Sequence, residues 1–195
     1  RYTNSVDQRV CCGANNRGLA IHGDTLFMGT LDAHLIAIDA RNGQPLWKTM
    51  VADAKLAYSV TMAPLVINDL VLVGTGGGEY GIRGFIAAYD VATGREAWRF
   101  YTVPAPGEPG SETWEGDSWK DRGGTNVWSV MSLDQKRGLV FLPLTSPSPD
   151  YYAAGRKGAN LFGDSVVALN AATGKRVWHF QTIHHNIWDY DLPAQ

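Results

Sequence analysis

The sequence is poor in cysteine and in charged side chains, and it has no long hydrophobic run. Only two of its 195 residues are cysteines, 18% are charged, and the formal net charge is -2. This balance excludes the basic surface that nucleic acids and anionic membranes attract. The longest apolar runs, such as 62–66 and 70–73, are far shorter than the roughly 20 residues of a membrane-spanning helix. We therefore expect no segment to span a bilayer.

Helical periodicity is also missing. No stretch of the sequence sustains apolar residues at the 3.6-residue spacing, which excludes helical solenoids and disfavours a helical bundle. The 22 glycines and 9 prolines are scattered between short apolar runs. This distribution is typical of strands joined by turns and not of a disordered chain.

The ends of the sequence indicate that the chain is a segment of a longer protein. It opens at Arg1 without an initiator methionine, and it stops at Gln195 without a recognisable strand or helix end. A targeting signal is then expected to lie outside the chain.

One pattern occurs three times along the chain: Ala-x-Asp/Asn, three residues, Gly, three residues, Trp. It covers residues 37–47, 88–98 and 168–178. An apolar strand runs into the Asp or Asn, a turn closes on a glycine that can adopt positive φ, and a second strand begins just before the Trp. Each occurrence therefore predicts a tight hairpin, and the three Trp residues are expected to cover the apolar gaps between units, with no chemical role.

Two further strand-like runs, joined by a polar turn, precede each hairpin. Each unit then holds four strands, and the units cover about 18–52, 62–103 and 125–183. Four-stranded units that repeat at roughly 40–50 residues are the signature of a β-propeller. We predict an all-β chain forming a single partial propeller domain over 1–195, with three to four blades. The predicted strand pairs that precede the hairpins are 18–21 with 26–30, 63–67 with 70–74, and 127–133 with 139–144.

A long segment without periodicity, residues 104–124, separates the second and third units. It contains three prolines, two tryptophans and a final Gly-Gly pair. Because the segment is too long for a plain connection, we predict a functional loop.

The two cysteines are neighbours, Cys11 and Cys12. A disulfide between them would close an eight-membered ring and strain the intervening peptide, because adjacent Cα atoms lie only ~3.8 Å apart. Two buried thiols are the simpler alternative. The residues alone leave both states open.

Residues 74–79, Gly-Thr-Gly-Gly-Gly-Glu, superficially match a dinucleotide-binding fingerprint. A true fingerprint opens a helix, whereas this one leads into a strand-like run, so we reject a nicotinamide site. The backbone of Gly76, Gly77 and Gly78 can approach a flat ligand closely. Glu79 then supplies a carboxylate that suits a hard cation.

Two aspartates near the end of the sequence, Asp189 and Asp191, have i, i+2 spacing. In an extended segment both carboxylates face one side, which suits a divalent or trivalent cation, whereas a solvated acidic loop is the alternative. The preceding His184 and His185 are adjacent and lack partners at metal-binding spacing, so they predict no zinc site.

Together these residues resemble the pyrroloquinoline-quinone (PQQ) dependent dehydrogenases, the quinoprotein alcohol and glucose dehydrogenase family. The resemblance covers nearly the whole chain and rests on five motifs in the expected order. It implies an eight-bladed propeller of which this chain supplies about the second to fourth blades. The motifs are Cys11-Cys12-(x)4-Arg17-Gly18, residues 61–66, 76–84 and 123–128, and Trp188-Asp189-Tyr190-Asp191.

The resemblance implies a sandwich for the planar PQQ ring. An oxidised ring of adjacent cysteines would lie against one face and a tryptophan would stack on the other. Side-chain donors would hold the carboxylates and polar edge of PQQ, and the glycines would let the backbone approach the ring. The implied contacts are Cys11, Cys12, Arg17, Thr61, Gly76, Gly77, Gly78, Thr125 and Trp128.

The resemblance also implies a cation, Ca²⁺ or a lanthanide, that acts as a Lewis acid on a quinone oxygen. Glu79 and Asp189 would be ligands, and Asp189 would also be the catalytic general base that takes the hydroxyl proton. Members of the family place an Asn ligand where this chain has Thr145-Ser146-Pro147, so either Ser146 or Thr145 substitutes for it or this ligand is missing. Asp191 stands where lanthanide-using members carry an extra aspartate, but the glucose dehydrogenase branch shares this tail.

The function implied is a PQQ- and metal-dependent dehydrogenase that transfers a hydride from a primary alcohol, sugar or polyol to the quinone. Its electron acceptor would be cytochrome c or a membrane quinone, and no nucleic acid is expected as a partner. An oxidised cysteine pair indicates a periplasmic or periplasm-facing, membrane-associated location. The alternative is a non-catalytic propeller scaffold with the same hairpin repeat. The remaining blades would lie outside this chain.

Overall fold

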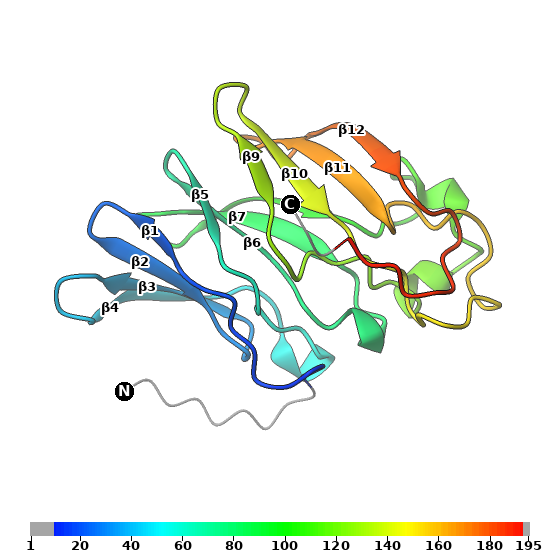
Figure 1. Ribbon diagram of the computed structural model, residues 1–195, viewed down its shortest axis with the longest axis horizontal. Helices are drawn as coiled ribbons and strands as arrows, with labels where there is room; N and C mark the ends of the chain where they lie inside the picture. The colour runs from blue at the N-terminus through cyan, green and yellow to red at the C-terminus, as the bar shows by residue number, and fades with distance from the viewer. Residues whose placement is uncertain (1–9, 193–195) are drawn as a thin grey trace.

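Three four-stranded antiparallel sheets make up the computed structural model, which describes residues 10–192. They lie side by side in chain order (Figure 1). The predicted domain, 1–195, also includes residues 1–9 and 193–195, which lie outside the described residues. Within residues 10–192 there is no helix with the length and hydropathy needed to cross a membrane.

Each sheet is built from strands that follow one another in the sequence, as the repeat predicts. The order is β1-β2-β3-β4 in the first sheet, β5-β6-β7-β8 in the second and β9-β10-β11-β12 in the third. The strands are β1 (Ala20–His22), β2 (Thr25–Gly29), β3 (His34–Asp39), β4 (Pro45–Met50), β5 (Leu65–Ile67), β6 (Leu70–Gly74), β7 (Phe85–Asp90), β8 (Glu96–Tyr101), β9 (Ser132–Asp134), β10 (Leu139–Pro143), β11 (Ser165–Asn170) and β12 (Arg176–Gln181).

The three hairpins share one turn, as the sequence pattern predicts. Gly43, Gly94 and Gly174 have φ of 72°, 69° and 69°, a backbone conformation that glycine adopts without strain. Each glycine N–H donates to the carbonyl of the Asp or Asn four residues earlier, at 2.8–2.9 Å. Local turn chemistry thus fixes the hairpin that ends each sheet.

Two of the repeat tryptophans join neighbouring sheets. Trp47 Nε1 donates to Val91 O at 3.1 Å, and Trp98 Nε1 donates to Ala171 O at 3.1 Å. Each indole also covers the turn glycine of the next hairpin, Gly94 or Gly174, so closely that a Cβ there would lie 2.4–2.6 Å from ring atoms. The prediction that these side chains cover the gaps between units is confirmed for both.

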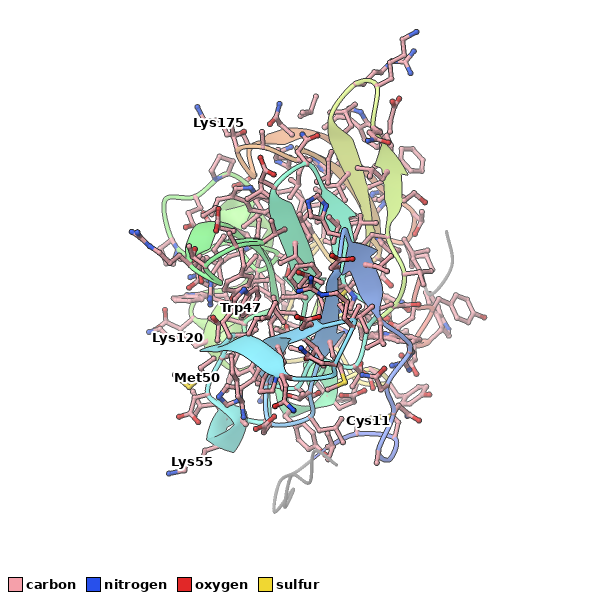
Figure 2. The ribbon with its side chains drawn as sticks, turned by 90° about the vertical axis from the view of Figure 1, so that its left-hand side faces the viewer. Cys11, Trp47, Met50, Lys55, Lys120 and Lys175 are labelled. Atoms are coloured by element: carbon pink, nitrogen blue, oxygen red, sulfur yellow. A yellow bond between two sulfur atoms is a disulfide. The ribbon has the colours of Figure 1, made fainter. Side chains whose placement is uncertain are left out.

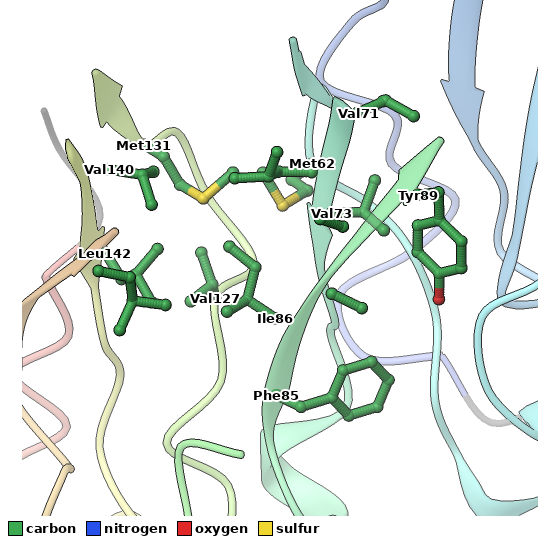
Figure 3. Packing of buried hydrophobic residues seen from close by; sticks show 14 of the residues in the cluster. Met62, Val71, Val73, Phe85, Ile86, Tyr89, Val127, Met131, Val140 and Leu142 are labelled. Atoms are coloured by element: carbon green, nitrogen blue, oxygen red, sulfur yellow. The ribbon is translucent and has the colours of Figure 1, made fainter. Parts of the chain in front are cut away.

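The apolar core fills the space between the sheets (Figure 3). Met62, Ile86 and Val127 are buried there, together with Val140 and Leu142 of the third sheet. Because this cluster draws on all three units, the loops at the ends of the sheets are held in fixed relative positions.

One predicted strand differs clearly from the structure. The run 127–133 was expected to be a strand, but β9 covers only Ser132–Asp134. The preceding backbone lies against the second sheet, where a Cβ on Gly74 would be 2.3 Å from Val127 O. Val127 is therefore apolar because it is buried between two sheets, not because it belongs to a sheet ladder.

The long segment 104–124 supports neighbouring loops. It contains the short 3-10 helices η3 (Ser111–Thr113) and η4 (Ser118–Lys120). Trp114 is buried and donates to Leu161 O at 2.6 Å, and the Asp121 carbonyl lies against Gly81. The other short helices, η1 (Ala54–Leu56) and η2 (Gly78–Tyr80), lie in the connections before β5 and after β6.

Candidate functional site

One cavity of about 210 Å³ gathers most of the residues singled out in the sequence. Its lining comes from the segments before β1, β5 and β9 and after β6, β10 and β12. Because neighbouring strands are antiparallel, the starts of the first strands and the ends of the second and fourth strands lie at the same end of each sheet. Figure 2 shows Cys11 of this lining at the opposite end of the molecule from Lys175 of the third hairpin turn. The fold thus brings together side chains up to 180 positions apart, from Cys11 to Asp191.

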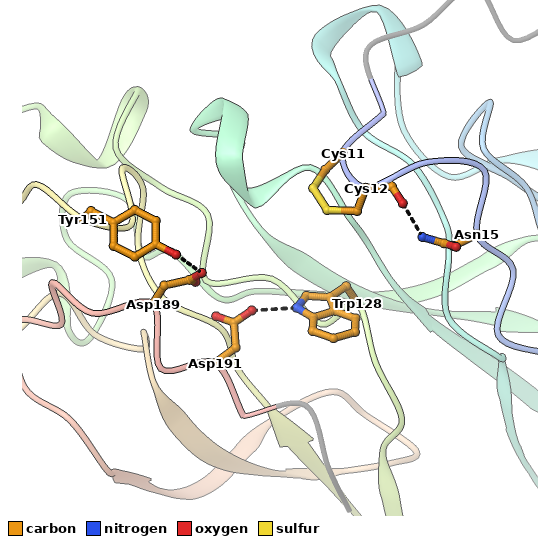
Figure 4. The surroundings of a disulfide bond; sticks show 7 residues. All are labelled: Cys11, Cys12, Asn15, Trp128, Tyr151, Asp189 and Asp191. Carbon is orange, nitrogen blue, oxygen red and sulfur yellow. Dashed lines mark hydrogen bonds between the residues drawn. A yellow bond between two sulfur atoms is a disulfide. The ribbon is translucent and has the colours of Figure 1, made fainter.

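A disulfide joins Cys11 and Cys12, whose Cα atoms are 3.8 Å apart. Asn15 Nδ2 donates to Cys12 O at 2.7 Å, which ties the ring to the segment that follows it (Figure 4). The two sulfurs lie within 4.8 Å of a Glu79 carboxylate oxygen. Because a cysteine binds metal as a thiolate, the oxidised sulfurs form a wall of the cavity and not a metal site.

Trp128 and Arg17 form a second wall. The Arg17 guanidinium lies 4.5 Å from the centre of the Trp128 ring, a cation–π contact. The backbone N–H of Arg17 donates to Thr61 O at 3.0 Å. Figure 4 shows the disulfide and the Trp128 indole on different sides of the space that they line. Of the predicted cofactor contacts, Arg17, Thr61 and Trp128 are therefore together at the cavity.

Gly76, Gly77 and Gly78 line the cavity, and close packing behind them requires glycine. A Cβ on Gly77 would lie 2.2 Å from Ala57 O, and one on Gly78 would lie 2.3 Å from Asn126 Oδ1. Gly77 also has a φ of 109°, which L side chains rarely adopt. Any larger residue here would displace the wall of the cavity.

Thr125 is not brought to the cavity. Its side chain is completely buried and its hydroxyl donates to Thr102 Oγ1 at 3.2 Å. Its backbone has a φ of 42° and its N–H is bound to Ser146 O, which turns the side chain towards the protein interior. The expectation that Thr125 holds the polar edge of PQQ is corrected: the following residue, Asn126, is the one that reaches the lining.

Four carboxylates line the cavity: Glu79, Asp150, Asp189 and Asp191. Asp150 is not predictable from a local pattern, because it follows β10 in a proline-rich loop with no repeat or paired acid to mark it. Burial and, after it, the negative charges of the nearby Asp189, Glu79 and Asp191 together raise the pKa of Asp150 to about 6. The cavity therefore concentrates negative charge.

Asp191 is held by two hydrogen bonds. Its Oδ2 accepts from Trp128 Nε1 and its Oδ1 accepts from Ser146 N, both at 2.9 Å (Figure 4). Burial nevertheless raises the pKa of Asp191. Asp191 is thus a link between the Trp128 wall and the carboxylates, besides being a predicted metal ligand.

Ser146 has a different environment from the one expected of a metal ligand. Its hydroxyl donates to Asp164 Oδ1 at 3.1 Å and accepts from Asn186 Nδ2 at 2.8 Å. The proton and one lone pair of the hydroxyl are therefore engaged in a buried network. The neighbouring Thr145 hydroxyl is likewise engaged, because it donates to Asn126 Oδ1 at 2.8 Å. Ser146 supports the site chiefly through the N–H that it gives to Asp191.

Asp189 lies in a loop that follows β12, with a φ of 57°. Its Oδ2 accepts from Tyr151 Oη at 3.0 Å (Figure 4). The predicted functional segment 104–124, in contrast, contributes no residue to the lining. Its part is to hold the loops around 81–84 and 158–162 in place.

Comparison with known proteins gives a consistent picture. The family model described as "PQQ: Glucose/ethanol/alcohol dehydrogenase, beta-propeller domain" matches residues 2–195. The chain is 41% identical to quinohemoprotein alcohol dehydrogenase ADH IIB of Pseudomonas putida, over 95% of this chain and 29% of that protein.

Two solved structures are similar over most of the chain. Quinohemoprotein alcohol dehydrogenase ADHIIG of Pseudomonas putida HK5 aligns with a TM-score of 0.89 and 41% identity, over 95% of this chain and 29% of its own. A europium-containing methanol dehydrogenase aligns with a TM-score of 0.86 and 36% identity, over 93% and 34%. The chain thus spans about a third or less of the length of these relatives.

Proposed function

The chain belongs to the glucose, ethanol and alcohol dehydrogenase family of PQQ β-propellers, and we propose that it supplies the cofactor and metal site of an enzyme that oxidises primary alcohols. The observation that carries the proposal is the shared cavity. A disulfide, an indole and four carboxylates, contributed by loops of three sheets, line one space of about 210 Å³.

The cavity walls fit a planar, anionic cofactor. The ring of Cys11 and Cys12 is one wall and the Trp128 indole is another, and Gly76 to Gly78 add bare backbone to the lining. Arg17 supplies a guanidinium of the kind that binds carboxylates. Bound there, PQQ would supply a two-electron acceptor for the substrate hydride, and the protein would orient the reacting groups.

The carboxylates fit a hard cation. Glu79, Asp189 and Asp191 offer the oxygen donors that Ca²⁺ prefers and that suit a trivalent lanthanide, with Asp150 beside them. The raised pKa values of Asp150 and Asp191 reflect burial and uncompensated like charges. A cation among them would relieve this repulsion, and we assign Glu79 and Asp189 as its principal ligands.

Asp189 is the proposed general base. A carboxylate can take the hydroxyl proton of an alcohol as the hydride leaves the adjacent carbon, provided that it lies within hydrogen-bonding reach. One oxygen of Asp189 is bound by Tyr151, and the other would face the substrate hydroxyl.

The proposal also covers the enzyme's substrate range, its electron acceptor and its location in the cell. The family description includes glucose as well as alcohols, so sugars and polyols belong in the same assay. We propose cytochrome c or a membrane quinone as the acceptor. The Cys11–Cys12 disulfide supports a periplasmic or periplasm-facing location, because oxidising compartments preserve such bonds.

Reconstitution tests this function in the whole enzyme that contains the segment. The enzyme is loaded with PQQ and with Ca²⁺ or a lanthanide, and dye reduction is followed over a panel of primary alcohols and sugars. We expect turnover that requires both additions. Asp189→Asn should lower kcat by about 100-fold or more while the PQQ absorbance is retained. Lack of turnover under every pairing would overturn the proposal and favour the non-catalytic scaffold.

A further inference from the structure

Tyr151 makes a cross-loop hydrogen bond that the reaction proposed above does not require. Its Oη donates to Asp189 Oδ2 at 3.0 Å and connects the loop after β10 to the loop after β12 (Figure 4). The Tyr151 side chain is 73% exposed. Burial of apolar surface therefore does not explain its position, and the polar contact with Asp189 does.

The two loops are also joined behind this contact by a buried charge. Arg156 is fully buried, and its Nη2 donates to Pro149 O at 3.1 Å and to Asn186 O at 2.5 Å. Pro149 lies two residues before Tyr151, and Asn186 lies three residues before Asp189. Hydrogen bonds from a charged guanidinium are strong, so the backbones that carry Tyr151 and Asp189 are fixed to each other.

Asp189 itself needs such support. Its φ of 57° is in the left-handed region, which costs a non-glycine residue free energy and persists only where neighbouring contacts impose it. The preceding Trp188 N–H donates to Asn186 Oδ1 at 2.8 Å, which orders the backbone of this turn. The hydrogen bond that directly restrains the Asp189 carboxylate comes from Tyr151.

We propose that Tyr151 is a positioning residue for Asp189, an inference that rests on the proposed role of Asp189 as the general base. The phenol fixes Oδ2, which stops rotation of the carboxylate and directs Oδ1 towards the substrate hydroxyl. Small displacements of a reacting group lower rates strongly. Tyr151 thus acts on the rate of the proton transfer and not on the binding of PQQ or alcohol.

Tyr151→Phe tests the proposal, and Tyr152→Phe is the matched control. Tyr152 is adjacent and 68% exposed, and it does not line the cavity. In the whole enzyme we expect Tyr151→Phe to lower kcat by about tenfold, with KM for the alcohol changed less than about twofold and with PQQ absorbance unchanged. Tyr152→Phe should behave as wild type. Wild-type kcat in Tyr151→Phe, or parallel losses in KM and cofactor binding, would overturn the proposal.

Crystal structures of both variants give a readout that does not depend on turnover. We expect the Asp189 carboxylate to adopt a second orientation in Tyr151→Phe and to keep one orientation in Tyr152→Phe. A single, unchanged orientation in both would contradict the positioning role. If wild type has no PQQ-dependent turnover at all, the proposed function fails, whereas this structural difference still decides whether Tyr151 orders Asp189.

Discussion

At the scale of single residues, Asp164 shows how a buried residue that supports the cavity differs from the residues that line it. It is 1% exposed, and its Oδ1 accepts from Ser146 and Asn186, whereas its Oδ2 is buried without a hydrogen-bond partner. Burial raises the pKa of Asp164 to about 6. The negative charge is therefore less stable in the folded protein than in water.

This shift predicts the pH dependence of stability. A carboxyl group whose pKa is raised in the folded state binds its proton more tightly there, so its contribution to stability falls as pH rises from about 4 to about 6. Asp164→Asn keeps the acceptor for Ser146 and Asn186 and removes the charge. We expect its free energy of unfolding to rise by the order of 2 kcal/mol at pH 7 and to change little at pH 4. Urea unfolding at both pH values measures this change. A loss of stability at pH 7 would contradict the prediction and would mean that the negative charge of Asp164 is needed to balance the positive charge of Arg156, with which it interacts.

Which site residues the sequence could identify depended on whether a local pattern marked them. Cys11, Cys12, Glu79 and Asp189 lie in distinctive motifs, and the structure brings all four to the cavity. Asp150 carries no such mark. The resemblance to the family implies roles for Thr125 and Ser146 from their positions in the motifs, but the direction of a hydroxyl is set by tertiary neighbours such as Thr102, Asp164 and Asn186.

At the scale of elements, the hairpins were predictable and the connections between units were not. The turn of β3 and β4 needs only a glycine at positive φ and an acceptor four residues earlier, both of which are local features. The segment before β9 is shaped by packing against Gly74 of another sheet. The segment 104–124 was correctly expected to be irregular, but its length did not indicate that it would support loops instead of lining the cavity.

The hairpin turns provide a matched pair of substitutions. Gly43 and Gly174 have φ of 72° and 69°, but a Cβ on Gly43 meets nothing within 4 Å, whereas one on Gly174 would lie 2.4 Å from the Trp98 ring. Gly43→Ala should therefore cost only the backbone strain, about 1 kcal/mol. Gly174→Ala should cost a further 1–3 kcal/mol, roughly, because the sheets are pushed apart. Thermal unfolding compares them, and equal losses would show that the tryptophan contact does not join the sheets.

At the scale of the whole molecule, the site is a property of the arrangement of sheets. Each sheet contributes between one and three segments at the same end of its strands, and no single unit holds both the disulfide and the carboxylates. The order of motifs along the sequence predicted membership of the family. It could not predict distances across the cavity, because these depend on how the sheets pack through Trp47 and Trp98.

The measurement that tests the account most directly is anomalous diffraction from the whole enzyme crystallised with PQQ and a lanthanide. We predict one strong anomalous peak within coordinating distance of carboxylate oxygens of Glu79 and Asp189. Electron density for PQQ should lie beside this peak, between the Cys11–Cys12 disulfide and Trp128. A metal peak outside this cavity would contradict the account. So would PQQ bound elsewhere, with the disulfide and the Trp128 indole in direct contact with each other.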